Sequence, residues 1–236
     1  MVDETDLSQE KKWYYEARAR TVIKSLLKRR MNGQYAPSRQ EALAAVMEMI
    51  PPGTTVARGD SVSVDQVGVP EELIKRNQNK FINPLKRDES GYFAYDTEER
   101  YRMEREAFSA DVFITSTNAI TLDGKLVSID GHGNRVSAMV FGPKRVIVVV
   151  GANKIVKDVD EALVRIHNVA APINTIRHYL KHNMTEAGNL PCVKEGRCVD
   201  CSHSERPCCY TVIIEGSGIM DKGRFDVVLV GEELGI

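Results

Sequence analysis

The sequence lacks the segments that would place a chain in or across a membrane. No apolar run approaches the ~20 residues that a transmembrane helix needs. The N-terminal stretch MVDETDLSQEKKWYYEARAR is charged from its start and has no apolar signal core. The formal net charge of −1 creates no long-range attraction to nucleic acid or to an anionic membrane surface. We therefore expect a cytoplasmic protein with neither a nucleic-acid nor a membrane partner.

Other absences narrow the class of binding site. The glycine spacing of a P-loop or of a dinucleotide fingerprint is missing, and there is no internal repeat or low-complexity tract. The basic run Lys28-Arg29-Arg30 has no interleaved aromatic residues that could stack on bases, so we interpret it as a solvated helix end. The length of 236 residues allows one or two domains with a well-developed core.

Cysteine is absent from residues 1–191 and then occurs five times within residues 192–209. The spacing is C-x5-C-x2-C-x6-C-C, in the segment PCVKEGRCVDCSHSERPCC. Thiols stay reduced in the cytoplasm, so this clustering favours a metal site over disulfides. Thiolates suit zinc and iron–sulfur clusters equally by softness. A single Cys-x-x-Cys pair and a proline before Cys208 make us favour a [4Fe–4S] cluster over zinc. The alternatives are a metal-free set of thiols or a redox disulfide, and His203 as a replacement ligand.

The pattern of apolar residues predicts an α/β fold. Residues 1–52 read as helix, with a capping box at Ser38 and Glu41 and a stop at Pro51-Pro52-Gly53. Beyond them, strands with continuous Val/Ile runs alternate with helices, which predicts a mostly parallel sheet with helices on both faces. We expect an N-terminal helical arm at 1–52, which packs on the sheet or mediates a homodimer, and an α/β domain at 53–236 with a Cys-rich insertion at 190–209. The predicted strands are 54–57, 111–115, 125–129, 145–150, 210–214 and 226–230, and the later helices are 63–75, 96–108, 158–168 and 173–181.

Polar loops follow three of the predicted strands. They are Gly59-Asp60-Ser61, Thr115-Ser116-Thr117-Asn118 and Gly151-Ala152-Asn153-Lys154. Ligands of open α/β sheets bind at the carboxyl ends of strands, so the three loops predict one shared pocket. Glycine lets backbone amides approach a ligand, and the hydroxyl and amide side chains add donors for phosphate or carboxylate groups. The alternative is that each loop is an ordinary turn or helix cap.

A fourth polar stretch, 130–135, reads Asp-Gly-His-Gly-Asn-Arg. Arg135 can clamp a carboxylate with two hydrogen bonds. His132 is the best candidate acid or base, with Asp130 and Asp60 as further candidates. We interpret His167 as a surface residue, and His178 and His182 as a solvated helix face. The predicted substrate-binding residues are Gly59, Asp60, Ser61, Thr115, Ser116, Asn118, Asn134, Arg135 and Lys154.

The central run ADVFITSTNAITLDGKLVSIDGHGNRVSAMVFGPKRVIVVVGANKIV, followed by VRIHNVAAPIN, resembles the LUD domain family, which includes lactate utilization protein C. The resemblance continues through CVKEGRCVDCSHSERPC and VVLVGEELG and covers roughly residues 7–236. It implies a fold like that of the ribose-phosphate isomerase and CoA-transferase superfamily. Relatives are linked to oxidation of lactate to pyruvate, alongside separate iron–sulfur subunits.

The resemblance also refines the metal ligands. The family's fourth cysteine matches Cys208, which makes Cys209 an extra residue and implies Cys192, Cys198, Cys201 and Cys208 as the ligand set. Residues 58–61 read Arg-Gly-Asp-Ser where relatives have a Gly-Gly-Ser-type loop, a departure that bears on the ligand. The cysteine segment is similar to that of stand-alone proteins from anaerobes more than to the lactate-operon type.

Three functions follow as expectations. The first is a redox-associated role in oxidation of lactate or a related small hydroxyacid, with an iron–sulfur protein as the redox partner. The second is an isomerase-like or transferase-like enzyme that acts on a small phosphorylated or CoA-linked metabolite and carries a structural metal. No glutamate stands out as the nucleophile that a CoA transferase needs. The third is a non-catalytic assembly subunit.

Overall fold

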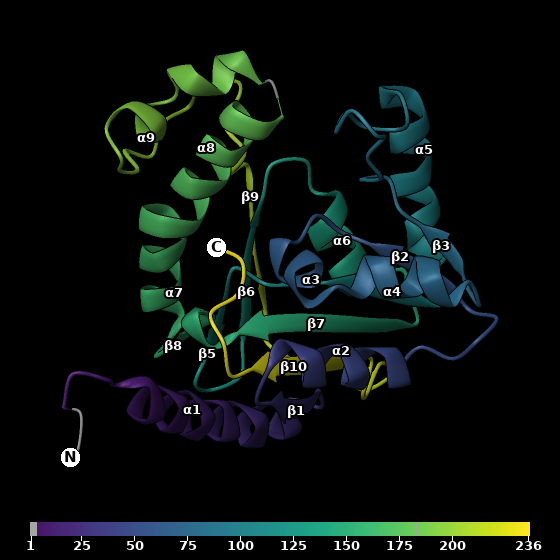
Figure 1. Cartoon of the computed structure of the whole chain (residues 1–236). Helices are drawn as coiled ribbons and strands as arrows, with labels where there is room; N and C mark the ends of the chain where they lie inside the picture. Colours follow the sequence, from purple (N-terminus) through teal and green to yellow (C-terminus); the bar gives the residue numbers. More distant parts are fainter. Residues whose placement is uncertain (1–3, 183) are drawn as a thin grey trace.

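The structure, a computed structural model, describes residues 4–182 and 184–236 and contains two β-sheets with helices around them (Figure 1). The larger sheet is parallel throughout, with the strand order β1-β10-β7-β4-β2-β3. This confirms the predicted α/β fold with a mostly parallel sheet. Its strands are β1 (Asn32–Ala36), β2 (Thr55–Arg58), β3 (Lys80–Ile82), β4 (Val112–Thr115), β7 (Arg145–Gly151) and β10 (Phe225–Val230).

Helices cover both faces of this sheet because its central strands bury side chains on both sides. In β7, Val148 belongs to the core on one face, whereas its neighbour Val149 belongs to the core on the other. Each fully buried valine contributes roughly 1.5–3 kcal/mol. The first face is covered by α1 (Ser8–Lys28), α5 (Thr97–Glu106) and α6 (Asn134–Val140), and the second by α2 (Arg39–Glu48), α3 (Val62–Val67) and α4 (Val69–Arg76).

Strand β1 shows that the prediction of helix throughout residues 1–52 is wrong at Asn32–Ala36; residues 1–3 of that range lie outside the described residues. Helix α1 ends before Arg30, which has a φ of 60°, and the chain then pairs with β10 in parallel. The strand sequence NGQYA has no apolar run, so its pattern did not predict a strand. The predicted helix start at Ser38 is confirmed, because Ser38 and Glu41 form the reciprocal capping box.

The second sheet is smaller and mixed, with the order β8-β5-β6-β9. Strand β6 runs antiparallel to both β5 and β9, whereas β8 runs parallel to β5. The sheet carries Asp130 at the end of β6 and holds β9 directly after the cysteine segment. Its strands are β5 (Ala119–Thr121), β6 (Leu126–Asp130), β8 (Ile155–Val156) and β9 (Tyr210–Ile214).

The helices predicted at 158–168 and 173–181 are joined end to end. A π-helical turn, Ile166–Ala170, connects α7 (Val159–Arg165) to α8 (Ala171–Lys181). Pro172 cannot donate a backbone hydrogen bond and would clash in a regular helix, and a wider turn just before it avoids both problems. The cysteine segment follows, with the short helix α9 (Pro191–Lys194) and the 3-10 turn Thr185–Asn189. Across residues 4–182 and 184–236, no helix is both long and apolar enough to cross a membrane.

Candidate functional site

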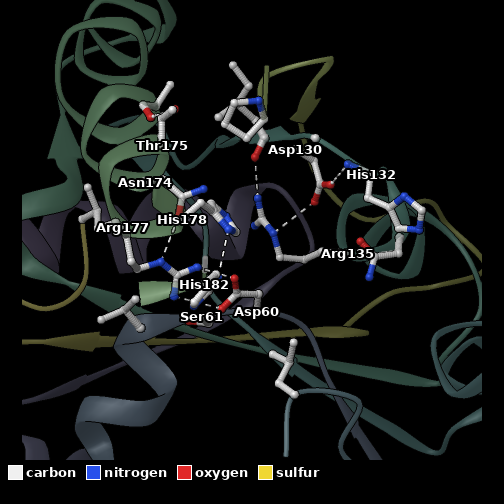
Figure 2. Close-up of a pocket in the computed structure, with 18 of the residues that line it drawn as sticks. Asp60, Ser61, Asp130, His132, Arg135, Asn174, Thr175, Arg177, His178 and His182 are labelled. Carbon is white, nitrogen blue, oxygen red and sulfur yellow. Dashed lines mark hydrogen bonds and ion pairs between the residues drawn. The ribbon is translucent and has the colours of Figure 1, made fainter. Parts of the chain in front are cut away.

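The polar loops after β2, β4 and β7 meet at a cavity of about 700 Å³. The loop after β6 and helices α5 and α8 contribute further walls (Figure 2). Two of the predicted residues, Gly59 and Thr115, do not line the cavity and are buried at the ends of their strands. A Cβ at Gly59 would lie 2.8 Å from Cγ of Arg135. The predicted residues that line the cavity are Asp60, Ser61, Ser116, Asn118, Asp130, His132, Asn134, Arg135 and Lys154.

Lys154 brings a buried amine to this cavity. It ends the turn that follows β7, and its side chain reaches between α3 and the loop after β4. Its Nζ lies 2.9 Å from Oγ of Ser63 and 3.2 Å from Oγ of Ser116, and the residue is only 4% exposed. Burial lowers its pKa to about 7, and the positive charges of Arg165 and Arg135 add to the effect. Near neutral pH, Lys154 therefore exchanges between a charged ammonium and a neutral amine.

Arg135 ties two walls of the cavity together. Its guanidinium donates to the carbonyl oxygen of Ser116 at 2.9 Å, to that of Ile129 at 2.7 Å and to Oδ1 of Asn118 at 3.2 Å. Its Nε lies 3.3 Å from Oδ2 of Asp130. Since a guanidinium has five N–H groups, these contacts leave it little capacity to clamp a substrate carboxylate. Arg135 therefore holds the loops after β4 and β6 together.

His132, the predicted acid or base, has a carboxylate partner that the sequence did not indicate. Its Nε2 lies 3.3 Å from Oε2 of Glu104, which comes from α5. Its ring stacks edge-on against Tyr101 at 4.7 Å. Burial raises the pKa of Glu104 above its ordinary value, although His132 opposes that shift. Oδ1 of Asp130 accepts from the backbone N–H groups of His132 and Gly133, so Asp130 shapes the loop.

The interpretation of His178 and His182 as a solvated face is wrong, since both line the cavity. Their Nδ1 atoms lie 3.0 Å apart, next to an ion pair between Asp60 and Arg177 (Figure 2). Burial, and then Arg177, lower the pKa of His178. Burial, then His178 and Arg177, lower the pKa of His182 to about 4. Both rings are therefore set to be neutral at physiological pH.

Asp60 lies in the loop after β2 and forms an ion pair with Arg177 of α8. Burial would raise its pKa, but the charge and hydrogen bonds of Arg177 outweigh it and hold the pKa below its ordinary value. Asp60 and Arg177 are 117 positions apart in the sequence. No local pattern could reveal this contact, because it depends on how α8 packs beside the loop after β2.

The charges around the two imidazoles give a testable expectation. Replacing Arg177 with Gln removes a positive charge beside both rings and frees the negative charge of Asp60. Both changes favour a protonated ring, so the pKa values of His178 and His182 should rise. Titration of the histidine side chains by NMR between pH 3 and pH 8 measures this. Unchanged titration midpoints in the variant would show that Arg177 does not act on the two rings.

The five cysteines line a second cavity of about 230 Å³. His167, interpreted from the sequence as a surface residue, also lines it, with Nδ1 3.4 Å from Sγ of Cys198. Burial raises the pKa of Cys208 to about 11. Within residues 4–182 and 184–236, no three Cys, His, Asp or Glu side chains are arranged to hold a metal ion. The thiols share one cavity, and they would have to move closer together to ligate a metal.

The two cavities share a wall. Ala171, Thr175 and Arg206 line both of them, and Sγ of Cys192 lies 3.8 Å from Oγ1 of Thr175. The segment between the last cysteines is also anchored to the loop after β6. A Cβ at Gly131 would lie 2.9 Å from Cα of Pro207, and the backbone N–H of Cys209 donates to the carbonyl oxygen of Asp130 at 2.9 Å. The cysteine segment is thus a wall of the larger cavity.

Comparison with known proteins identifies the family. No curated protein matches the chain. A DUF162 family protein from Deinococcus radiodurans is 16% identical over 92% of this chain and 97% of that chain, with a TM-score of 0.49. Ribose 5-phosphate isomerase from Plasmodium falciparum is 16% identical over 50% of this chain and 52% of that chain, with a TM-score of 0.32. The family model of the LUD domain matches residues 19–230, and the chain belongs to the LUD domain family.

Proposed function

We propose that the larger cavity binds a small hydroxycarboxylate such as lactate and that the protein takes part in its oxidation. The observation that carries this proposal is the environment of Lys154. Its Nζ faces the hydroxyls of Ser63 and Ser116, and the charged side chains that shift its pKa are both arginines. A buried ammonium of this kind gains most from an anionic ligand. A carboxylate beside the two hydroxyls would supply that charge.

The charge of the cavity lining supports an anionic ligand. Positive side chains outnumber negative ones, so the field in this hollow favours anions. The positive set is Arg58, Arg100, Arg135, Lys154, Arg177 and Arg206, and the negative set is Asp60, Glu104, Asp130 and Glu205.

Oxidation of a hydroxycarboxylate to an oxo acid releases two electrons and two protons. The neutral pair His178 and His182 can accept the hydroxyl proton, because the ring that donates in their Nδ1–Nδ1 contact keeps a free lone pair on Nε2. His132 with Glu104 is a second proton acceptor on the opposite wall. We propose that the electrons pass to a separate iron–sulfur protein.

Calorimetric titration with L-lactate tests the proposal. Binding should weaken between pH 6 and pH 8.5 by up to roughly tenfold per pH unit above 7, because Lys154 loses its charge there and an anion favours the charged form. Proton uptake on binding, measured in two buffers of different ionisation enthalpy, should accompany it. Tighter binding of ribose 5-phosphate than of lactate would favour the isomerase-like alternative. Absence of binding by either compound would favour an assembly subunit.

We also propose that Cys192, Cys198, Cys201 and Cys208 hold a metal, as a [4Fe–4S] cluster or as zinc. The support is chemical: soft thiol donors gather around one cavity beside the proposed substrate site. An iron–sulfur cluster there would supply one-electron redox chemistry, and zinc would stabilise the segment. Cys209 is exposed and is left out of the set.

Metal analysis of protein purified without oxygen distinguishes these forms. Iron and sulfide with broad visible absorbance would identify a cluster, and stoichiometric zinc without colour would identify a structural site. Cys201→Ser should lose the metal, whereas Cys209→Ser should retain it. Full metal content in Cys201→Ser would exclude the proposed ligand set.

A further inference from the structure

Lys154 differs from the other lysines of the described residues, because it is the one that is buried. Lys154 lines the larger cavity, and the residue is only 4% exposed. The chain passes directly beside the amine: a Cβ at Gly235 would lie 2.8 Å from Nζ. The amine therefore has few water contacts, and it belongs to a residue that lines the cavity. These are the conditions under which a lysine acts as a nucleophile.

We propose that Lys154 forms an imine with the carbonyl group of a 2-oxo acid bound in the larger cavity. This rests on the proposed function, since an oxo acid is the oxidation product of a hydroxycarboxylate. The Nζ lone pair attacks the carbonyl carbon and gives a carbinolamine. The carbinolamine then loses its hydroxyl and a nitrogen proton as one water, and a C=N bond forms. The step is a condensation and needs no oxidant or reductant.

The hydroxyls around Nζ are placed to assist this condensation. Oγ of Ser63 and Oγ of Ser116 lie 2.9 Å and 3.2 Å from Nζ, and 3.5 Å from each other. A hydroxyl can donate and accept at once, so the pair can carry a proton from the nitrogen to the departing oxygen. Both hydroxyls are fixed by the fold, on α3 and on the loop after β4.

The charges around Lys154 also favour the reactive form. Only the neutral amine is nucleophilic, and neighbouring cations together with burial increase its population. At pH 7 about half of the Lys154 side chains carry the neutral amine, since their pKa is about 7. An exposed lysine has on the order of 10³-fold less amine at this pH. Lys154 is thereby distinguished from the solvent-exposed lysines of the surface.

Reductive trapping tests the inference on the full chain. Pyruvate or glyoxylate is mixed with the protein between pH 6 and pH 8, and borohydride is added to convert any imine to a stable secondary amine. Mass spectrometry should show one adduct per chain, and peptide mapping should place it on Lys154. The adduct should exceed that on any exposed lysine by roughly 10-fold or more and should increase from pH 6 to pH 8.

Two variants serve as controls. Lys154→Met should give no specific adduct, whereas Lys157→Met, three positions away and 79% exposed, should label as the wild type does. If Lys154→Met folds poorly, peptide mapping of the wild type still shows whether Lys154 carries the adduct. An adduct spread over exposed lysines, or none at all, would overturn the inference.

Lactate separates this inference from the proposed function. It has no carbonyl group, so it cannot form an imine, but it should protect Lys154 by occupying the cavity. Lactate binding without a pyruvate adduct would overturn the imine and leave the proposed function standing. If lactate does not lower the yield of the Lys154 adduct, the imine is supported and lactate is contradicted as the ligand.

Discussion

Replacing Lys154 with methionine should weaken lactate binding by on the order of 10- to 100-fold and should stabilise the folded protein below pH 7. Binding weakens because the variant loses the buried cation. Stability rises because the folded pKa of Lys154, about 7, lies below its ordinary value of 10.5. Below pH 7 the wild type carries the full cost of burying an ammonium. As the pH rises from 7 toward 10.5, the unfolded chain holds more protons than the folded one, so that cost disappears.

Denaturant titration at pH 6 and pH 9 measures this effect. At pH 6 the free energy of unfolding of Lys154→Met should exceed that of the wild type. This difference should be smaller at pH 9 by about 2–3 kcal/mol. Lys157→Met, which replaces an exposed lysine, should show no such trend. An equal difference at both pH values would mean that the amine is not buried as the structure shows it.

Replacing Arg135 with alanine should destabilise the protein by roughly 3–5 kcal/mol. The change removes three donated hydrogen bonds and leaves the carboxylate of Asp130 without its ion pair. Both side chains are nearly buried, at 11% and 8% exposure, so water replaces these contacts poorly. The loops after β4 and β6 would separate, and the cavity between them would lose its shape.

Thermal unfolding and lactate titration of the Arg135→Ala variant test this role together. Arg135→Lys should be intermediate, because lysine keeps the charge near Asp130 but cannot reproduce the several directed hydrogen bonds. Arg102→Ala, on an exposed part of α5, should unfold nearly as the wild type does. Loss of binding with unchanged stability would mean that Arg135 contacts the ligand instead of bracing the loops.

The part of the fold that sequence predicted best is the part with the simplest local pattern. The Val-rich strands β7 and β10 are buried on both faces, and continuous apolar runs indicate such strands directly. Their positions in turn indicated where polar loops meet, and Lys154 and Ser116 do face one cavity. Strand β1 escaped prediction because Asn32 and Gly33 do not favour strands, and its pairing with β10 overrides that local preference.

The site residues that sequence reasoning missed come from tertiary packing. His178 and His182 have helical spacing, which cannot tell a solvated face from one turned into a cavity. Glu104 lies in the strongly charged helix α5, where no pattern separates it from its exposed neighbours. The π-helical turn before Pro172, a feature that often occurs at functional sites, is visible only in the structure.

The edge strand β1 has a consequence for how the chain is made. Asn32 pairs with Asp226, so this edge of the sheet forms only after residues far along the chain have been made. Until β10 leaves the ribosome, β1 lacks the strand with which it pairs, and α2 lacks part of the sheet face on which it packs. Contacts of such long sequence separation slow folding and lengthen the exposure of apolar surface. Folding of this side of the sheet is therefore expected to wait until β10 has been synthesised, and nascent chains that lack β10 should depend on chaperones to stay soluble.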